Sequence, residues 1–428
     1  MFAQTCTRSI SAWRSTHVSF THAYDASLVL YPNPTSSIMA AMQVDKLDVD
    51  SYLATAASSA PSDLHPFFEK FRKLHERKLW HQLTLTLFEF LQHPNSGPFQ
   101  VDLFTKFVRD FEDKLNQLKL VSMGVHVSKQ LDDPNAILTF LSALLERISK
   151  EKSREAWILL VSSIAHTKLI FGDLTGTKVD MDECQKLLDD LDGVEPSVHA
   201  AYYEVAADYY KAKADYVPYY KNSLLYLACV DVEVDLTSDQ RLVRAHDLSI
   251  AALLGETIYN FGELLQHPIM AALDNTPQQW LKDLLYVFNE GNIGKFESIM
   301  PLFPQEPILE ENHPFLRQKI CLMALIEAVF KRMGTGSAGK TMSFQTIAEE
   351  TRLPQDEVEH LVMKALSLKL IQGTLDQVSE SATITWVQPR VLSRSQLSQL
   401  ASRLDEWCDR IDALDSFVQQ QTPELFAH

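Results

Sequence analysis

The stretch Thr341–Leu392 constrains the fold more than any other part of the chain, because its hydrophobic period changes from that of a helix to that of a strand. Ser343 is a favourable helix N-cap, and apolar side chains follow it at helical spacing. Pro354 interrupts this helix, since the residue before a proline avoids the helical region, and residues 355–368 predict a second amphipathic helix. Ile384 then lies in a segment of alternating residues, which indicates a strand. Helix, turn, helix, strand, polar turn and strand together predict a winged helix.

Winged helices often bind DNA, so the charge of this stretch bears on its function. The second helix carries Asp356, Glu357 and Glu359 near its start, where carboxylates suit the helix dipole but repel phosphate. The tip Asp376–Glu380 has no lysine or arginine to hold a phosphate, and the whole chain has a formal net charge of −17. We therefore predict a winged helix that docks proteins. A nucleic-acid-binding winged helix is the alternative, and it predicts steeply salt-dependent binding.

From Leu64 to the start of the winged helix, the chain is almost entirely helical by pattern. Amphipathic stripes recur between polar or Gly/Pro breaks, such as those at Asn95–Pro98 and Gly193–Pro196. A helix pair of this kind cannot bury its apolar face alone, so successive pairs are expected to stack. The predicted fold is an all-α solenoid of helical pairs followed by a winged helix and a C-terminal helix, with a small β content in the wing.

The segment Val198–Val230 is rich in tyrosine, with alanines between the aromatic residues. An aromatic stripe can stack nucleic-acid bases, but such stripes usually come with basic residues. Here Lys211 and its basic neighbours are offset by carboxylates such as Glu204 and Asp208. We therefore interpret the tyrosines as packing between paired helices.

The last helical segment, Ser393–Gln421, has apolar residues at alternating steps of three and four. This spacing is an a/d heptad seam, the pattern of coiled-coil and bundle packing. The helix either folds back on its own domain or meets partner helices. We predict the second, because the seam is regular and follows a complete module. The predicted protein-binding residues are Leu397, Leu400, Leu404, Trp407, Ile411, Leu414 and Val418.

Five segments together carry a resemblance to a known family, in which they occur in the same order. They are KLWHQLTL (Lys78–Leu85), NFGELLQHP (Asn260–Pro268), QWLKDLLYVFNEGN (Gln279–Asn292), VEHLVMKAL (Val358–Leu366) and TWVQPRVL (Thr385–Leu392). The chain resembles the family of the proteasome non-ATPase regulatory subunit 13, a component of the regulatory-particle lid. The resemblance covers about Leu64–Val418, and the Met1–Ala60 extension and the Gly334–Gly339 insert depart from it.

That family ends in a PCI module, which consists of stacked helical pairs capped by a winged helix. The resemblance therefore implies a division of the chain into six parts. They are a disordered or mispredicted N-terminal extension (1–62), a helical-repeat arm (63–210), the helical part of the PCI module (211–333), a Gly-rich linker (334–340), the winged helix (341–392), and a C-terminal bundle helix with its tail (393–428).

The resemblance also implies the function. It predicts a non-catalytic structural subunit of the lid that supports ubiquitin-dependent protein degradation in the cytoplasm and nucleus, as part of a hetero-oligomer. Its partners are other PCI subunits, and in the family the terminal helices gather into a common bundle. We predict a second contact at Thr383, Thr385 and Val387, where a free sheet edge pairs with or packs beside the neighbouring PCI subunit. A PCI scaffold of the signalosome or of a translation initiation complex is the alternative.

Motifs for catalysis or cofactor binding are weak. Gly334–Thr341 fits the P-loop expression, but a helix precedes it and the next helix begins too late for phosphate binding, so we interpret it as a linker. The five cysteines are scattered and form no CxxC pair, which favours reduced thiols in the cytosol or nucleus. No HExxH, His-x-His or GxSxG motif and no membrane-spanning apolar run occurs. We predict no catalytic, cofactor or metal site, and no nucleic-acid, membrane or small-molecule partner.

The N-terminal segment Met1–Tyr24 lacks acidic residues and contains Arg8, Arg14 and several Ser and Thr residues. This composition is typical of a mitochondrial transit peptide. An unstructured tail is the alternative, and so is a start of translation at Met39 or Met42. Because the remainder resembles a proteasome subunit, we do not expect the segment to direct the protein to mitochondria.

Overall fold

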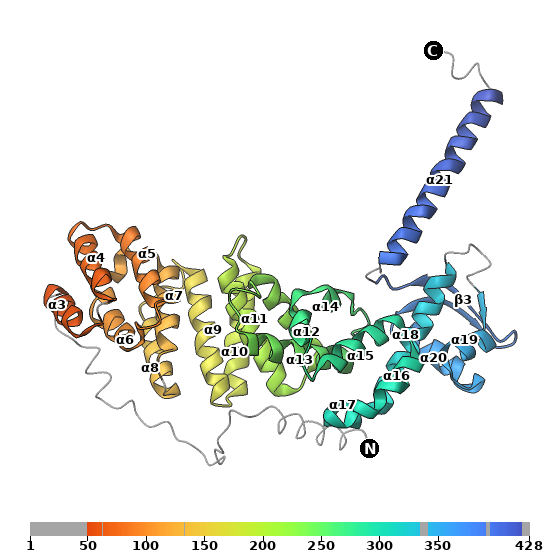
Figure 1. Ribbon diagram of the computed structural model, residues 1–428, viewed down its shortest axis with the longest axis horizontal. Coiled ribbons are helices and arrows are strands. Elements are labelled where there is room, and N and C mark those ends of the chain that lie inside the picture. Colours follow the sequence, from red (N-terminus) through yellow and green to blue (C-terminus); the bar gives the residue numbers. More distant parts are fainter. Residues whose placement is uncertain (1–48, 62, 132, 334–340, 391–393, 422–428) are drawn as a thin grey trace. The chain divides into compact units, whose positions relative to one another are not determined.

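The computed structural model describes residues 49–61, 63–131, 133–333, 341–390 and 394–421 (Figure 1). Helices account for most of these residues, and one small sheet lies near the C-terminal end. The predicted fold class, a helical solenoid followed by a winged helix and a C-terminal helix, is confirmed. The predictions for residues 1–48, for the Gly-rich linker 334–340 and for the tail 422–428 lie outside the described residues.

The chain divides between Thr237 and Ser238 into two compact units. The predicted boundary between residues 210 and 211 instead falls inside a helix. In unit 1 the helices follow one another in chain order, from red to green in Figure 1. They are α3 (Val49–Ser59), α4 (His65–Glu76), α5 (Trp80–Leu91), α6 (Gly97–Lys106), the 3-10 helix η1 (Val108–Lys114), α7 (Gln117–Ser128), α8 (Pro134–Leu145), α9 (Arg154–Ile170), α10 (Leu174–Asp189), α11 (Pro196–Lys213) and α12 (Tyr216–Cys229).

Local sequence signals start these helices. The side chains of Asn116, Asp133 and Asp173 each accept a hydrogen bond from a backbone N–H at the start of α7, α8 and α10 respectively. Pro134 and Pro196 occupy the first turns of α8 and α11, where the missing N–H has no intrahelical acceptor to lose. The polar breaks seen in the sequence therefore act as helix boundaries.

The N-terminal extension is shorter than predicted. Residues 49–59 form α3 rather than a disordered segment, and Leu53, Ala56 and Ala60 are buried in the core of unit 1. These three apolar side chains are spaced three and four residues apart, which places them on one face and docks the short helix on its neighbours.

Aromatic side chains dominate the core of unit 1. Phe68, Phe71 and Phe90 are almost fully buried, and their rings pack edge to face with centroids 5.6–6.0 Å apart. The tyrosines of α11 and α12 behave as predicted. Tyr202 and Tyr219 are both buried between helices, and burial raises the pKa of Tyr202.

Unit 2 begins with a helical part and ends with the winged helix and the last helix. Its elements are α13 (Ser238–Leu254), α14 (Gly262–Gln266), η2 (Pro268–Leu273), α15 (Gln279–Glu290), α16 (Ile293–Ile299), η3 (Met300–Gln305), α17 (Pro307–Glu311), α18 (His313–Met333), β1 (Thr341–Ser343), α19 (Phe344–Thr351), α20 (Gln355–Ser367), β2 (Ile371–Asp376), β3 (Ser381–Val387) and α21 (Arg394–Gln421). Helix α18 is central, because all ten residues from Ile320 to Val329 are buried, and all of them except Glu327 are apolar.

A close approach between α15 and α18 depends on one glycine. Gly291 ends α15 with a φ of +67°, a conformation that favours glycine. A Cβ atom there would lie 2.8 Å from the Cα of Ala324 in α18. Gly291 therefore allows the backbones of α15 and α18 to pack together.

The winged-helix sheet has the strand order β1-β3-β2, with both pairings antiparallel. Ser343 caps α19 as predicted, since its side chain accepts a hydrogen bond from the backbone N–H of Thr346. The sequence did not predict β1, which places Thr341 opposite Thr383. Because β1 pairs with Ser381–Thr383, the predicted free edge is wrong at Thr383, whereas β1 does not reach Thr385 or Val387.

Candidate assembly interface

Helix α21 presents the predicted heptad seam to solvent. All seven seam residues are exposed, with exposed fractions between 42% for Val418 and 63% for Leu414. Phe417, which the heptad rule did not select, is exposed to 58% and widens the apolar surface beside Val418. Exposed apolar side chains in one continuous stripe are unfavourable in water, so such a stripe marks a contact surface.

The three predicted strand residues are placed differently. The hydroxyl groups of Thr383 and Thr341 lie 3.1 Å apart across the β1–β3 pair, and Val387 pairs with Ile371 of β2. Thr385 is the extra residue of a β-bulge and donates its hydroxyl to the carbonyl of Gln372 at 3.1 Å. Their backbone or hydroxyl groups are thus used within the sheet, and these residues lie on a different element from the α21 seam.

Glycine makes the bulge possible. A Cβ atom on Gly373 would lie 2.1 Å from the backbone oxygen of Thr383 in the neighbouring strand. Gly373 lies inside β2, where only a residue without a side chain allows this close approach. The bulge leaves Trp386 at the surface, with an exposed fraction of 38%.

The winged helix is held on the helical part of unit 2 by charged side chains. Arg390, three residues after β3, donates to the carboxylate of Glu327 in α18 and to the carbonyl of Asn289 in α15, the latter at 3.2 Å. Arg352 pairs with Glu297 of α16 at 3.2 Å. Arg390 and Glu327 are both nearly buried, so their pairing fixes where the chain leaves the winged helix, just before α21.

A buried histidine links α13 to the start of α17. His246 is 2% exposed, and its Nε2 lies 2.9 Å from the Glu306 carboxylate while its Nδ1 lies 3.4 Å from that of Asp247. Burial lowers the pKa of His246, but the hydrogen bonds to Asp247 and Glu306 outweigh it and raise the pKa to about 9. This is a charged structural contact, which the sequence analysis did not find because Glu306 is distant in the chain.

A buried lysine caps the C-terminal end of α13. The Lys319 ammonium donates to the carbonyls of Ala252, Leu253 and Gly255 at 2.7–3.0 Å, which gives each of its three protons an acceptor. The side chain is 1% exposed, and burial lowers its pKa. The ammonium therefore satisfies the unpaired carbonyls at the C-terminal end of α13, where a cation also suits the helix dipole.

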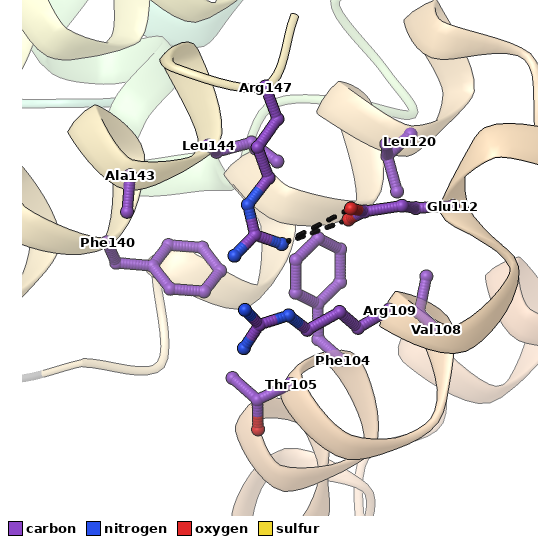
Figure 2. A pocket seen from close by; sticks show the side chains of 10 residues that line it. All are labelled: Phe104, Thr105, Val108, Arg109, Glu112, Leu120, Phe140, Ala143, Leu144 and Arg147. Atoms are coloured by element: carbon purple, nitrogen blue, oxygen red, sulfur yellow. Dashed lines mark hydrogen bonds and ion pairs between the residues drawn. The ribbon is translucent and has the colours of Figure 1, made fainter. Parts of the chain in front are cut away.

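A separate hollow in unit 1 is lined mainly by residues of α6, η1, α7 and α8 (Figure 2). Arg147 pairs with Glu112 across it at 3.1 Å, and the phenyl rings of Phe104 and Phe140 form part of its wall. Burial lowers the pKa of Arg109, as does the charge of Arg147, whereas Glu112 opposes the shift. The ten lining residues include no cysteine or histidine, and the carboxylate of Glu112 is paired with Arg147.

The described residues add no support for phosphate binding or metal binding. Most of the P-loop-like segment lies outside the described residues, and Thr341 at its end begins strand β1 rather than a helix, so the helix N-terminus that would bind phosphate is missing there. Among the described residues, no group of three His, Cys, Asp or Glu side chains is arranged to hold a metal ion. No helix in the described ranges is long and apolar enough to cross a membrane.

Comparison with known proteins decides the family. The family model for PSD13 N-terminal repeats matches residues 67–285, and the model for the PCI domain matches residues 302–385. A probable 26S proteasome regulatory subunit rpn9 of Schizosaccharomyces pombe is 41% identical over 87% of this chain and 96% of the relative. The chain belongs to the family of 26S proteasome non-ATPase regulatory subunit 13.

Other relatives of the subunit 13 family agree. The 26S proteasome regulatory subunit RPN9 of Saccharomyces cerevisiae is 39% identical over 89% of this chain and 98% of its own length. The non-ATPase regulatory subunit 13 homolog B of Arabidopsis thaliana is 36% identical over 88% of this chain and 98% of its length. By contrast, the eukaryotic translation initiation factor 3 subunit M of Emericella nidulans is 28% identical over 38% of this chain. The alternative of a translation initiation scaffold thus has only a distant similarity behind it.

Proposed function

We propose that this protein is a non-catalytic scaffold subunit of the lid of the 26S proteasome regulatory particle, and that it supports ubiquitin-dependent protein degradation. Its membership of the subunit 13 family and its PCI domain support this assignment. The observation that carries the assembly role is the exposed seam of α21. A chain that carries an apolar seam of this length gains stability when the seam is buried against other helices.

The seam enters a bundle with helices of other lid subunits. Each of its side chains is about half exposed in the free chain, so burial of the other half contributes roughly 1 kcal/mol per side chain. Seven such side chains together contribute several kcal/mol, before the entropy lost on association. The proposed contact residues are Leu397, Leu400, Leu404, Trp407, Ile411, Leu414 and Val418, to which the structure adds Phe417.

The winged helix makes the second proposed contact, to a neighbouring PCI subunit. Strand addition at Thr383 is not part of the proposal, because β1 already pairs with β3 there. The contact we propose is side-by-side packing, in which Thr383, Thr385 and Val387 contribute only their side chains. The partners are other PCI-containing lid subunits, which would make the protein part of a hetero-oligomer.

The proposal also covers chemistry and location. We expect no enzymatic activity and no bound cofactor, because the subunit acts by holding other subunits in place. We expect the protein in the cytoplasm and nucleus, where proteasomes act. An ATPase assay on the purified chain with and without Lys340→Ala checks the first point. ATP hydrolysis that Lys340→Ala abolishes would contradict a purely structural role.

The double substitution Leu404→Asp with Trp407→Asp tests the bundle contact. Both residues are exposed in the free chain, so the variant folds, but burying two carboxylates in a helical bundle costs several kcal/mol. We expect the tagged variant to lose co-purification with other lid subunits. Gln399→Asp with Ser402→Asp is the control, because it adds the same charge on the outer face of the same helix. Equal recovery of lid subunits with both variants would disprove the bundle contact.

A further inference from the structure

The charged side chains of α21 are sorted around its seam. In heptad terms, Leu404 and Ile411 occupy a positions, so Arg403 and Arg410 occupy the g positions directly beside them. The outer b, c and f positions carry acidic residues instead, namely Asp405, Glu406, Asp409 and Asp412. Both arginines are exposed. One flank of the seam is therefore basic, although the helix as a whole is acidic.

The two flanks of the seam also differ in size. The g flank carries Arg403 and Arg410 and then Phe417, which is exposed to 58%. The e flank carries the small residues Ala401 and Cys408 and then the acidic residue Asp415. A partner helix therefore meets two small side chains followed by a carboxylate on the e side, and two cations followed by an aromatic ring on the g side.

Flanking residues determine which helix a heptad seam accepts, because g and e side chains of adjacent helices face each other. Arg403 and Arg410 are seven residues apart, which corresponds to about 10 Å along the helix axis. We propose that the seam binds a helix of another chain with a specific pattern on the facing flank, namely acidic, acidic and apolar residues at successive seven-residue steps. This inference rests on the proposed bundle contact and specifies the partner's chemistry.

A second copy of the chain fits this flank less well. In an antiparallel pair, g residues face g residues, so the arginine flanks would repel each other. In a parallel pair, g residues face e residues, so Arg410 would lie opposite Asp415 of the second copy, but Arg403 would lie opposite Cys408, which offers no carboxylate. A parallel second copy therefore satisfies only one of the two arginines. Charge complementarity thus favours a different chain with an acidic flank.

Two designed peptides test the proposal with the full-length chain. Both are four-heptad helices with Leu at a and d, and they differ only in having Glu or Lys at the e and g positions. Fluorescence anisotropy measures their binding to the wild type. Each exposed arginine attracts the Glu peptide and repels the Lys peptide, so we expect the Glu peptide to bind about tenfold more tightly than the Lys peptide. That ratio should shrink at 1 M salt, because screening weakens exposed charge pairs.

Two variants assign the effect to the flank. Arg403→Glu with Arg410→Glu should reverse the preference in favour of the Lys peptide. Arg403→Gln with Arg410→Gln should remove most of the preference for the Glu peptide. Ser402→Glu with Ser416→Glu is the control, because it changes the net charge by the same amount on the outer face of the helix, and it should leave the preference nearly unchanged. Equal binding of both peptides by the wild type, binding of neither, or exchange of the peptide for a dimer of this chain would overturn the proposal. The bundle contact itself is judged separately by Leu404→Asp with Trp407→Asp.

Discussion

The stability of unit 2 should fall as the pH rises from neutral to alkaline, because of one buried histidine. The pKa of His246 is about 9 in the folded chain and about 6.5 when the chain is unfolded. A group whose pKa is raised by folding adds stability that is complete below its unfolded pKa and is lost as the pH rises through its folded pKa. The window for His246 therefore runs from about pH 6.5 to about pH 9.

The size of the effect follows from the difference between the two pKa values. One pKa unit corresponds to about 1.4 kcal/mol, so the whole shift amounts to about 3 kcal/mol. The side chain is almost fully buried between Asp247 and Glu306, so solvent screens these contacts little. For a unit of this size the loss corresponds to a fall of roughly 6–12 °C in melting temperature.

Thermal melts of the wild type and His246→Gln between pH 6 and pH 9.5 isolate this contribution, because other titrating groups affect both proteins alike. We expect the melting temperatures to differ most near pH 6 and to converge towards pH 9.5. His267→Gln is the control, since burial lowers the pKa of His267 and its contribution varies only below pH 6.5. A difference between wild type and His246→Gln that stays constant across this range would refute the charged cluster.

Two further substitutions test the packing of unit 2 by chemical denaturation. Gly291→Ala places a Cβ atom 2.8 Å from Ala324 and should destabilise the chain by about 2 kcal/mol or more. Gly172→Ala is the control, because Gly172 also has a positive φ but has open space around it, and it should cost about 1 kcal/mol. Equal costs would mean that the close approach of α15 and α18 does not matter. Lys319→Met leaves three buried carbonyls unpaired and should cost about 2–4 kcal/mol, because relief of the buried charge offsets only part of the loss. Lys331→Met, at an exposed side chain, should change the stability by under about 0.5 kcal/mol, and a similar value for Lys319→Met would contradict its capping role.

Features with a local signal were predictable from the sequence. Ser343 marks the start of α19, and Pro354 marks the break before α20, because caps and prolines act within a few residues. The tyrosines between Val198 and Val230 could be assigned to the core because no excess of basic residues accompanies them. The heptad of α21 is equally local, since its period can be read along a single helix.

Features that depend on distant contacts were not predictable. The position of β3 in the middle of the sheet depends on β1, a strand of three residues whose pattern is too short to recognise. His246 lies 60 residues before Glu306, and Lys319 lies 67 residues after Ala252, so neither pairing leaves a trace in local spacing.

The exposure of the seam is the one property of α21 that its sequence could not decide. A helix folded back on its own domain and a helix that waits for partners have the same apolar period, because the period describes the face and not what covers it. In this chain Leu404, Trp407 and Leu414 each remain more than half exposed, so the described residues do not cover the seam, and its contact with partner helices stays a prediction. At the same time, β1 and β2 flank β3 on both sides over Ser381–Thr383. Among the described residues of unit 2, most of the exposed large apolar side chains therefore lie on α21, and the basic flank of this helix gives its seam a means to choose among partner helices.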